Sequence, residues 1–137
     1  MAYWLLKTEP ESFSYSDLVR LGRDCWNGVK NFAAIKNINT MKPGDLAFIY
    51  HTGREKAIVG VAEVVSEAYP DPQEADKRFS VIDVKPRYQM PRPVTLKEIK
   101  QNSIFRDWEL VRQPRLSVMP VIEEHWKLLH TLADKKL

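Results

Sequence analysis

The stretch "LAFIYHTGREKAIVGVAEVVSEAY" (residues 46–69) decides the fold class, because it holds two apolar runs joined by a short polar turn. We predict a strand over 46–52, a turn over 53–56 and a long strand over 57–69. Strands joined by so short a turn must pair antiparallel. Gly60 interrupts the second run, which indicates a bulge or a close approach of backbone.

Short elements surround this hairpin on both sides. Apolar runs and alternating patterns predict further strands over 2–7, 79–88 and 115–121. Helical periodicity and helix start signals predict helices over 14–22, 31–41, 95–101, 103–112 and 122–133. The acidic, proline-containing segment 70–78 is predicted to be a loop, and "MPRPVT" (90–95) a connector.

Side-chain spacing supports the helix predictions. Ser14 and Thr95 each stand three residues before an acidic side chain, which is the spacing of a capping box. We expect Leu18 and Leu21 to face inward from the first helix. In the last helix the residues expected on one face are Ile122, Trp126, Leu129 and Ala133.

The order of the elements excludes a doubly wound sheet, because strands cluster in the middle without regular helical crossovers. We therefore predict an α+β fold: a small, strongly curved, barrel-like sheet, mostly antiparallel, flanked by short helices. The chain of 137 residues fits one domain over 1–137, with an ordinary globular composition of 44% apolar and 28% charged residues.

Composition also bounds the location and the partners. No apolar run approaches the roughly 18–20 residues that cross a bilayer, so we expect no membrane partner. The N-terminus lacks the pattern of a signal peptide, and Cys25 is the one cysteine, so we expect a cytoplasmic protein without an intrachain disulfide. The net charge of +3 is compatible with a polyanionic partner but does not require one. We expect a monomer.

The sequence offers little for catalysis or metal binding. Cys25 stands between Asp24 and Trp26, and neither neighbour would activate a thiolate. His125 and His130 are five apart, which does not align them on one helix face. We expect no metal, no cofactor and no enzymatic activity. The alternative is an enzyme or accessory domain acting on RNA or a nucleotide, which would use His51 or Cys25.

The stretch "CWNGVKN" (25–31) is too polar for an ordinary core strand, and its Asn-Gly pair predicts a turn. Trp26 is either a core anchor beside this turn or the wall of a pocket for a flat ligand. Asn31 either caps the following helix or offers its amide to the edge of a nucleobase. The strand end at 50–52 is likewise either solvated or the rim of a polar pocket.

Four motifs, in this order and spacing, resemble the EVE domain. They are "WLLKTEP" (4–10), "WNGVKN" (26–31), "MKPGD" (41–45) and "YHT" (50–52), and the resemblance extends over residues 2–131. That family belongs to the PUA-like group and is more distantly related to the YTH readers of methylated adenine. The resemblance implies a compact PUA-like barrel. It also implies a non-enzymatic reader of DNA or RNA. Such a reader takes a modified base, a 5-substituted cytosine, into an aromatic pocket of the protein.

The same resemblance implies which residues do this work. Those expected to contact the base are Lys7, Thr8, Trp26, Val29, Asn31, Tyr50, His51, Thr52, Phe79, Arg115, Leu116 and Ser117. Charge alone, apart from the resemblance, leaves two roles open, phosphate contact or solubility, for Lys30, Lys36 and Arg54, together with Lys7 and Arg115. A closer alternative keeps the fold but makes structured RNA the target, without selectivity for a modification.

Two departures from the family pattern stand out. The loop over 70–78 is shorter than is usual in the family, which removes contacts to the strand that carries the base. Phe79 stands where the family tends to have tryptophan, and phenylalanine lacks the indole N–H donor.

Overall fold

A computed structural model describes residues 1–135 of the chain, so the last two residues of the predicted domain 1–137 lie outside the described part. The helices are α1 (Tyr15–Leu21), α2 (Phe32–Thr40), α3 (Leu96–Lys100), α4 (Glu109–Arg112) and α5 (Glu123–Asp134), with a 3₁₀ turn η1 (Ser103–Phe105). The strands are β1 (Tyr3–Thr8), β2 (Asp24–Trp26), β3 (Leu46–His51), β4 (Ala57–Val64), β5 (Tyr69–Pro70), β6 (Ser80–Thr95) and β7 (Val118–Val121).

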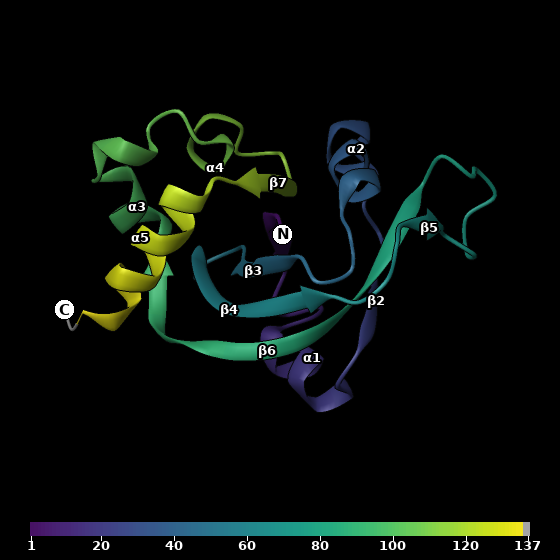
Figure 1. Ribbon diagram of the computed structural model, residues 1–137, viewed down its shortest axis with the longest axis horizontal. Helices are drawn as coiled ribbons and strands as arrows, with labels where there is room; N and C mark the ends of the chain where they lie inside the picture. The colour runs from purple at the N-terminus through teal and green to yellow at the C-terminus, as the bar shows by residue number, and fades with distance from the viewer. Residues whose placement is uncertain (136–137) are drawn as a thin grey trace.

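One mixed sheet in the order β2-β6-β4-β3-β1-β7 curls into a half-barrel, with β5 paired to β6 (Figure 1). Only β1 and β3 are parallel among the pairs that the structure describes in residues 1–135. Short helices flank the sheet, with α3, α4 and α5 together at one end and α2 toward the other (Figure 1). The predicted α+β class, with its curved and mostly antiparallel sheet, is confirmed. No helix among residues 1–135 has the length and apolar character needed to cross a membrane.

The long strand β6 is the main correction to the predicted elements. The segment predicted as a connector, 90–95, is the second half of this 16-residue strand. Pro91 and Pro93 suggested an end to the strand, but both lie where β6 has no Cα partner on β4, between the pairs Gly60–Gln89 and Ile58–Val94. Proline is tolerated at such an irregularity because no ladder hydrogen bond is lost.

The predicted second strand of the hairpin was too long, since β4 ends at Val64. The helix predicted over 103–112 is instead η1 and α4, because the backbone of Trp108 is extended (ψ 141°) and separates them. Two apolar side chains that were expected to face inward are exposed. Leu21 is the last residue of α1, and Ile122 is the N-cap of α5.

Other local signals were read correctly. Ser14 and Asp17 form the reciprocal capping box of α1, and Asn31 caps α2 by accepting hydrogen bonds from two backbone N–H groups. The side chain of Thr95 caps α3. The buried carboxylate of Asp45 accepts hydrogen bonds from the indole of Trp4 and two backbone amides, and so joins the start of β1 to the start of β3.

Gly60 marks both of the features that its position predicted. The register of β3 with β4 shifts beside it, which is a bulge, and the ring of Tyr15 lies against its Cα. A Cβ added at Gly60 would stand 2.6 Å from Cε1 and Cζ of that ring. The hydroxyl of Tyr15 donates to Val61 O, and it also lies 2.9 Å from Tyr88 O on β6. Tyr15 therefore holds the start of helix α1 against β4 and β6 at the bulge.

Candidate functional site

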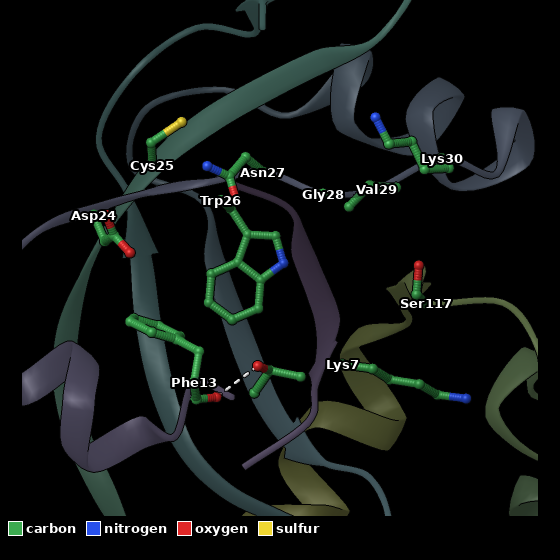
Figure 2. Close-up of a pocket in the computed structure, with 11 residues that line it drawn as sticks. Lys7, Phe13, Asp24, Cys25, Trp26, Asn27, Gly28, Val29, Lys30 and Ser117 are labelled. Carbon is green, nitrogen blue, oxygen red and sulfur yellow. Dashed lines mark hydrogen bonds between the residues drawn. The ribbon is translucent and has the colours of Figure 1, made fainter. Parts of the chain in front are cut away.

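A pocket of about 290 Å³ opens beside the indole ring of Trp26 (Figure 2). We call it the indole pocket. This volume lies near the lower end of the range of roughly 300–1,000 Å³ that is typical of small-molecule sites, so it suits a single small planar group. The residues that line it are Lys7, Thr8, Phe13, Asp24, Cys25, Trp26, Asn27, Gly28, Val29, Lys30 and Ser117.

Strand β2 aims its side chains alternately. The stretch 25–31, judged too polar for an ordinary core strand, nevertheless begins in a short one, because Asp24–Trp26 pair antiparallel with Val84–Ile82 of β6. Alternation sends Asp24 and Trp26 to one face and Cys25 to the other. Figure 2 shows the carboxylate of Asp24 on the same side as the indole, and the sulfur of Cys25 pointing away. The turn predicted after Trp26 is present, with Gly28 in the left-handed region at φ +80°.

Trp26 belongs to the core and to the pocket at once. Its side chain is 7% exposed and its ring meets that of Phe13 edge to face, with centroids 6.0 Å apart. The residue is thus a core anchor that also lines a pocket. The ring is therefore mostly covered, in part by Phe13, and only a small part of it borders the pocket. Its N–H finds no acceptor within residues 1–135, and the nitrogen is not sealed from solvent. In Figure 2 this nitrogen points toward the side of Ser117 and Lys7.

The opposite wall of the indole pocket comes from β1 and from the segment before β7. The backbone N–H of Lys7 donates to Ser117 O at 2.9 Å, which holds these two segments together. Thr8 donates its hydroxyl to Phe13 O at 2.6 Å and so fixes the aromatic ring that faces Trp26. Lys7 extends out of the pocket, where Nζ donates to Pro114 O, and partial burial lowers the pKa of its ammonium group.

Five lining residues were not singled out from the sequence as site residues. They are Phe13, Asp24, Cys25, Asn27 and Gly28. The neighbours of Trp26 carried a usable signal, since a turn after a short strand must bring its own residues to the same rim. Phe13 carried none, because only the tertiary pairing of β1 with β3 brings the segment before α1 under the indole.

The structure brings six predicted residues to the indole pocket: Lys7, Thr8, Trp26, Val29, Lys30 and Ser117. It places three others in a shallower hollow of about 360 Å³, namely Asn31, Arg115 and Leu116. The side-chain oxygen of Asn31 is already used as the cap of α2. Tyr50 and Thr52 line a separate hollow that shares Lys7 with the indole pocket.

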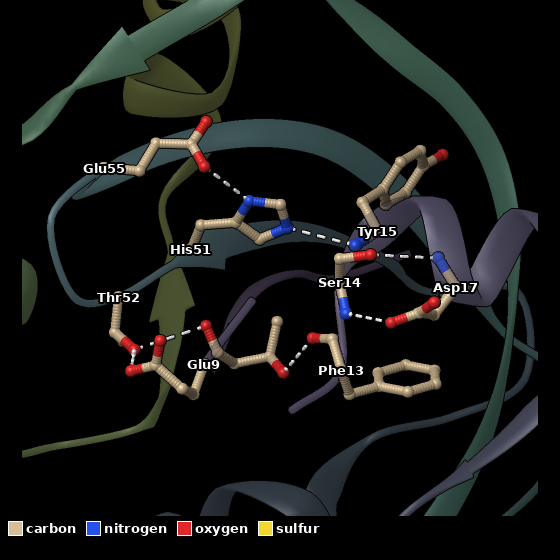
Figure 3. A network of polar contacts seen from close by, with 9 residues as sticks. Glu9, Phe13, Ser14, Tyr15, Asp17, His51, Thr52 and Glu55 are labelled. Carbon is tan, nitrogen blue, oxygen red and sulfur yellow. Dashed lines mark hydrogen bonds and ion pairs between the residues drawn. The ribbon is translucent and has the colours of Figure 1, made fainter. Parts of the chain in front are cut away.

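His51 lies outside the indole pocket, inside a polar network that holds the segment before α1 (Figure 3). Its Nε2 accepts a hydrogen bond from the backbone N–H of Tyr15 at 3.0 Å. Its Nδ1 therefore carries the proton and donates to Glu55 at 2.8 Å. The neighbouring Thr52 donates to Glu9 at 3.1 Å. Both ring nitrogens of this buried histidine are therefore occupied within the described residues, and we infer a structural role for it.

Replacement of His51 by alanine is expected to lower stability and to leave ligand binding intact. The change leaves the N–H of Tyr15 and the carboxylate of Glu55 without their partner, at a cost of about 1–2 kcal/mol. Chemical denaturation with an oligonucleotide titration in parallel measures both effects. A loss of affinity larger than the loss of folded protein would return His51 to the site.

Phe79 also lies away from the indole pocket. Phe79 lies in the loop that leads into β6, and its ring stacks on that of Phe32, with centroids 5.4 Å apart. Lys30 Nζ lies 4.6 Å from the centroid of the Phe79 ring. Lys30 also pairs with Glu74, so the 71–79 segment holds one wall of the pocket. Lys36, on the exposed face of α2, and Arg54, in the turn before β4, do not line the indole pocket.

The thiol of Cys25 is not built for nucleophilic attack. Burial raises its pKa, and the carboxylates of Asp83, Asp71 and Asp24 act in the same direction. A higher pKa leaves less thiolate at neutral pH. Within residues 1–135 no group of three or more His, Cys, Asp or Glu side chains is arranged to hold a metal ion.

Known proteins share this architecture. Thymocyte nuclear protein 1 of Mus musculus is 31% identical, covering 96% of this chain and 74% of its own. A Rhodopseudomonas palustris protein solved by NMR is 41% identical with a TM-score of 0.92, covering 97% of this chain and 93% of that one. The human THYN1 protein in complex with DNA containing 5-methylcytosine is 30% identical with a TM-score of 0.92, and both chains are covered completely. The family model of the EVE domain matches residues 2–132, and the chain belongs to the EVE domain family.

Proposed function

We propose that residues 1–137 act as one non-enzymatic, nucleic-acid-binding module that encloses a single modified base, a 5-substituted cytosine, in the indole pocket. The observation that carries this proposal is the pocket itself. Its volume is about 290 Å³, and the indole ring of Trp26 forms part of its lining. The complex of the human relative with DNA containing 5-methylcytosine supports the choice of ligand. A cytoplasmic location stays a prediction from the sequence.

The energetics of such a site balance. A base inside a duplex must be unstacked before it is enclosed, which costs a few kcal/mol. Stacking of the extruded base on an aromatic ring returns about 1–3 kcal/mol. The unpartnered N–H of Trp26 and the hydroxyl of Ser117 supply further hydrogen bonds to the base. The apolar side chains of Val29 and Phe13 offer the kind of contact that a 5-methyl group makes.

Asp24 adds a reason to favour cytosine that is independent of any resemblance. Its carboxylate lines the indole pocket on the same strand face as Trp26 and accepts no hydrogen bond within residues 1–135. A carboxylate accepts from the exocyclic amino group of cytosine, whereas thymine and uracil offer an acceptor oxygen there. Two acceptors face to face repel, so Asp24 selects for a base that donates.

A binding panel tests this proposal. Single-stranded DNA and RNA of one sequence, carrying cytosine, 5-methylcytosine, 5-hydroxymethylcytosine or thymine at one position, are titrated at one fixed salt concentration. We expect the 5-substituted cytosines to bind most tightly. Equal affinity across the modifications would defeat the modified-base proposal, and tighter binding of every RNA would favour the alternative of RNA recognition without that selectivity.

Asp24→Asn is expected to erase the preference for 5-methylcytosine over thymine. An asparagine amide both donates and accepts, so the discrimination of about 1–3 kcal/mol that such a contact supplies is lost. Asp107→Asn, at an exposed position outside the pocket, removes the same charge and serves as the control. If both variants keep the 5-methylcytosine to thymine ratio, Asp24 does not read the base.

A further inference from the structure

Two further hollows lie on the side of Lys7, and the first of them shares Lys7 with the indole pocket. The first, of about 230 Å³, is lined by Lys7, Lys56, Leu96 and Lys100 among others. The second, of about 570 Å³, shares Lys56, Leu96 and Lys100 with the first. Lys7 lines both the indole pocket and the first hollow, so the hollows follow one another in a row that begins next to the indole pocket. We name these two hollows the basic groove.

The walls of the basic groove carry five cationic side chains: Lys7, Arg54, Lys56, Lys97 and Lys100. None of the five forms an ion pair with a residue in the described range 1–135. Eleven other basic side chains do form such pairs: Arg20, Arg23, Lys30, Lys42, Arg78, Lys85, Arg87, Arg92, Arg106, Arg112 and Lys127. Cationic side chains without an ion-pair partner in the described residues are therefore gathered along the two hollows.

The acidic residue Glu55 also borders the groove, and five cationic side chains outnumber it there. Its carboxylate accepts a hydrogen bond from Nδ1 of the buried His51 at 2.8 Å. The apolar side chain of Leu96 contributes to both hollows, so the groove combines an apolar surface with cationic walls. A sugar-phosphate backbone presents the matching surfaces, since its sugars are less polar than its phosphates.

The backbone holds this arrangement in place. Lys56 has φ +45°, in the left-handed region that side-chain-bearing residues rarely adopt. Its carbonyl accepts a hydrogen bond from the backbone N–H of Leu96 at 2.7 Å, which fixes the turn after β3 against the start of α3. A lysine is thus kept at a position where glycine would be unstrained, and such strain clusters at functional sites.

We propose that the basic groove binds the phosphates of the nucleic-acid strand whose base occupies the indole pocket, an inference that rests on the proposed function. Phosphate contacts position a strand without reading its sequence. Lys7 belongs to both cavities, which places the groove where the strand must leave the pocket. A strand whose base lies in the indole pocket would pass beside Lys7, which favours a nucleic-acid strand over a free anion as the occupant.

The test compares the double variant Lys97→Gln/Lys100→Gln with the unaltered chain. Affinity for single-stranded oligonucleotides with and without 5-methylcytosine is measured over a series of salt concentrations. We expect the slope of log K against log salt to fall by about 1.4, at about 0.7 per lost phosphate contact. Binding at about 0.15 M salt weakens roughly threefold to tenfold, and the ratio between modified and unmodified strands stays the same.

Two further variants complete the design. Lys127→Gln removes an equal charge per residue from the exposed face of α5, outside the groove, and is expected to leave the slope unchanged. Lys56→Gly is expected to lower the slope while keeping the fold, because glycine adopts a φ of +45° without strain.

Three outcomes would overturn the assignment: an unchanged slope in the groove variants, an equal fall for Lys127→Gln, or displacement of the strand by inorganic phosphate at equal charge concentration. Failure of the proposed function reads out differently. It would show as equal affinity of the unaltered chain for modified and unmodified strands, whatever happens to the slope.

Discussion

Replacement of Trp26 by alanine is expected to reduce affinity for the modified base by roughly tenfold to a hundredfold, beyond any loss of folded protein. The change removes the stacking surface, which contributes about 1–3 kcal/mol per base, and the open N–H donor with it. Affinity is measured at a temperature where circular dichroism shows the variant to be folded, so that the two losses separate.

The same substitution also carries a large structural cost. Trp26 is 7% exposed and packs against Phe13 and the core, so its truncation is expected to cost about 3–5 kcal/mol. Part of any loss of binding by the alanine variant therefore reflects a loss of folded protein. Trp26→Phe is therefore the sharper variant, since it keeps a ring in place and removes area and the N–H.

Trp108→Phe is the matched control. Trp108 is equally buried, lies outside the indole pocket, and donates its indole N–H to Pro120 O at 3.1 Å. Its replacement is expected to lower stability and leave binding unchanged, whereas Trp26→Phe weakens binding with less effect on stability, because no intramolecular hydrogen bond is lost. Similar affinity for both variants would show that the indole of Trp26 is a core residue and nothing more.

Replacement of Gly60 by alanine is expected to destabilise the fold by about 3 kcal/mol, at the upper end of the range for overpacked sites. The new methyl group would stand 2.6 Å from carbons of the Tyr15 ring. That ring has little freedom to retreat, because its hydroxyl is hydrogen-bonded to Val61 and lies within hydrogen-bond reach of Tyr88. For a chain of this length the loss corresponds to a melting temperature lower by roughly 10 °C.

A double-mutant cycle identifies the cause. Tyr15→Leu removes the obstructing ring, so Gly60→Ala is expected to cost much less in that background than in the unaltered chain. Equal costs in the two backgrounds, measured by thermal or urea denaturation, would show that the ring of Tyr15 is not the obstacle.

The local parts of this fold were readable from the sequence because neighbouring residues encode them. The hairpin around 53–56, the capping box at Ser14 and the cap at Asn31 each depend on residues a few positions apart. The continuity of β6 was not readable, because Pro91 and Pro93 are compatible with a strand only where the partner strand bulges away. That condition is set by β4 and is invisible in the segment itself.

The site divides along the same line. Trp26 was identified because a large aromatic residue beside an Asn-Gly turn is conspicuous within its own stretch. The position of His51 outside the indole pocket was not readable, because its neighbours on β3 say nothing of the backbone N–H of Tyr15 that occupies its ring. Phe13 was missed for the same reason, since its contact with the indole arises from tertiary structure.

The hold of the 71–79 segment on Lys30, through Glu74 and Phe79, has a consequence for how members of this family diverge. The ring of Trp26 is positioned by β2, whereas the width of the indole pocket depends on the segment 71–79, far along the chain. We therefore expect insertions or deletions in that segment to change the size of the base substituent that the pocket admits, while the position of the Trp26 ring stays the same.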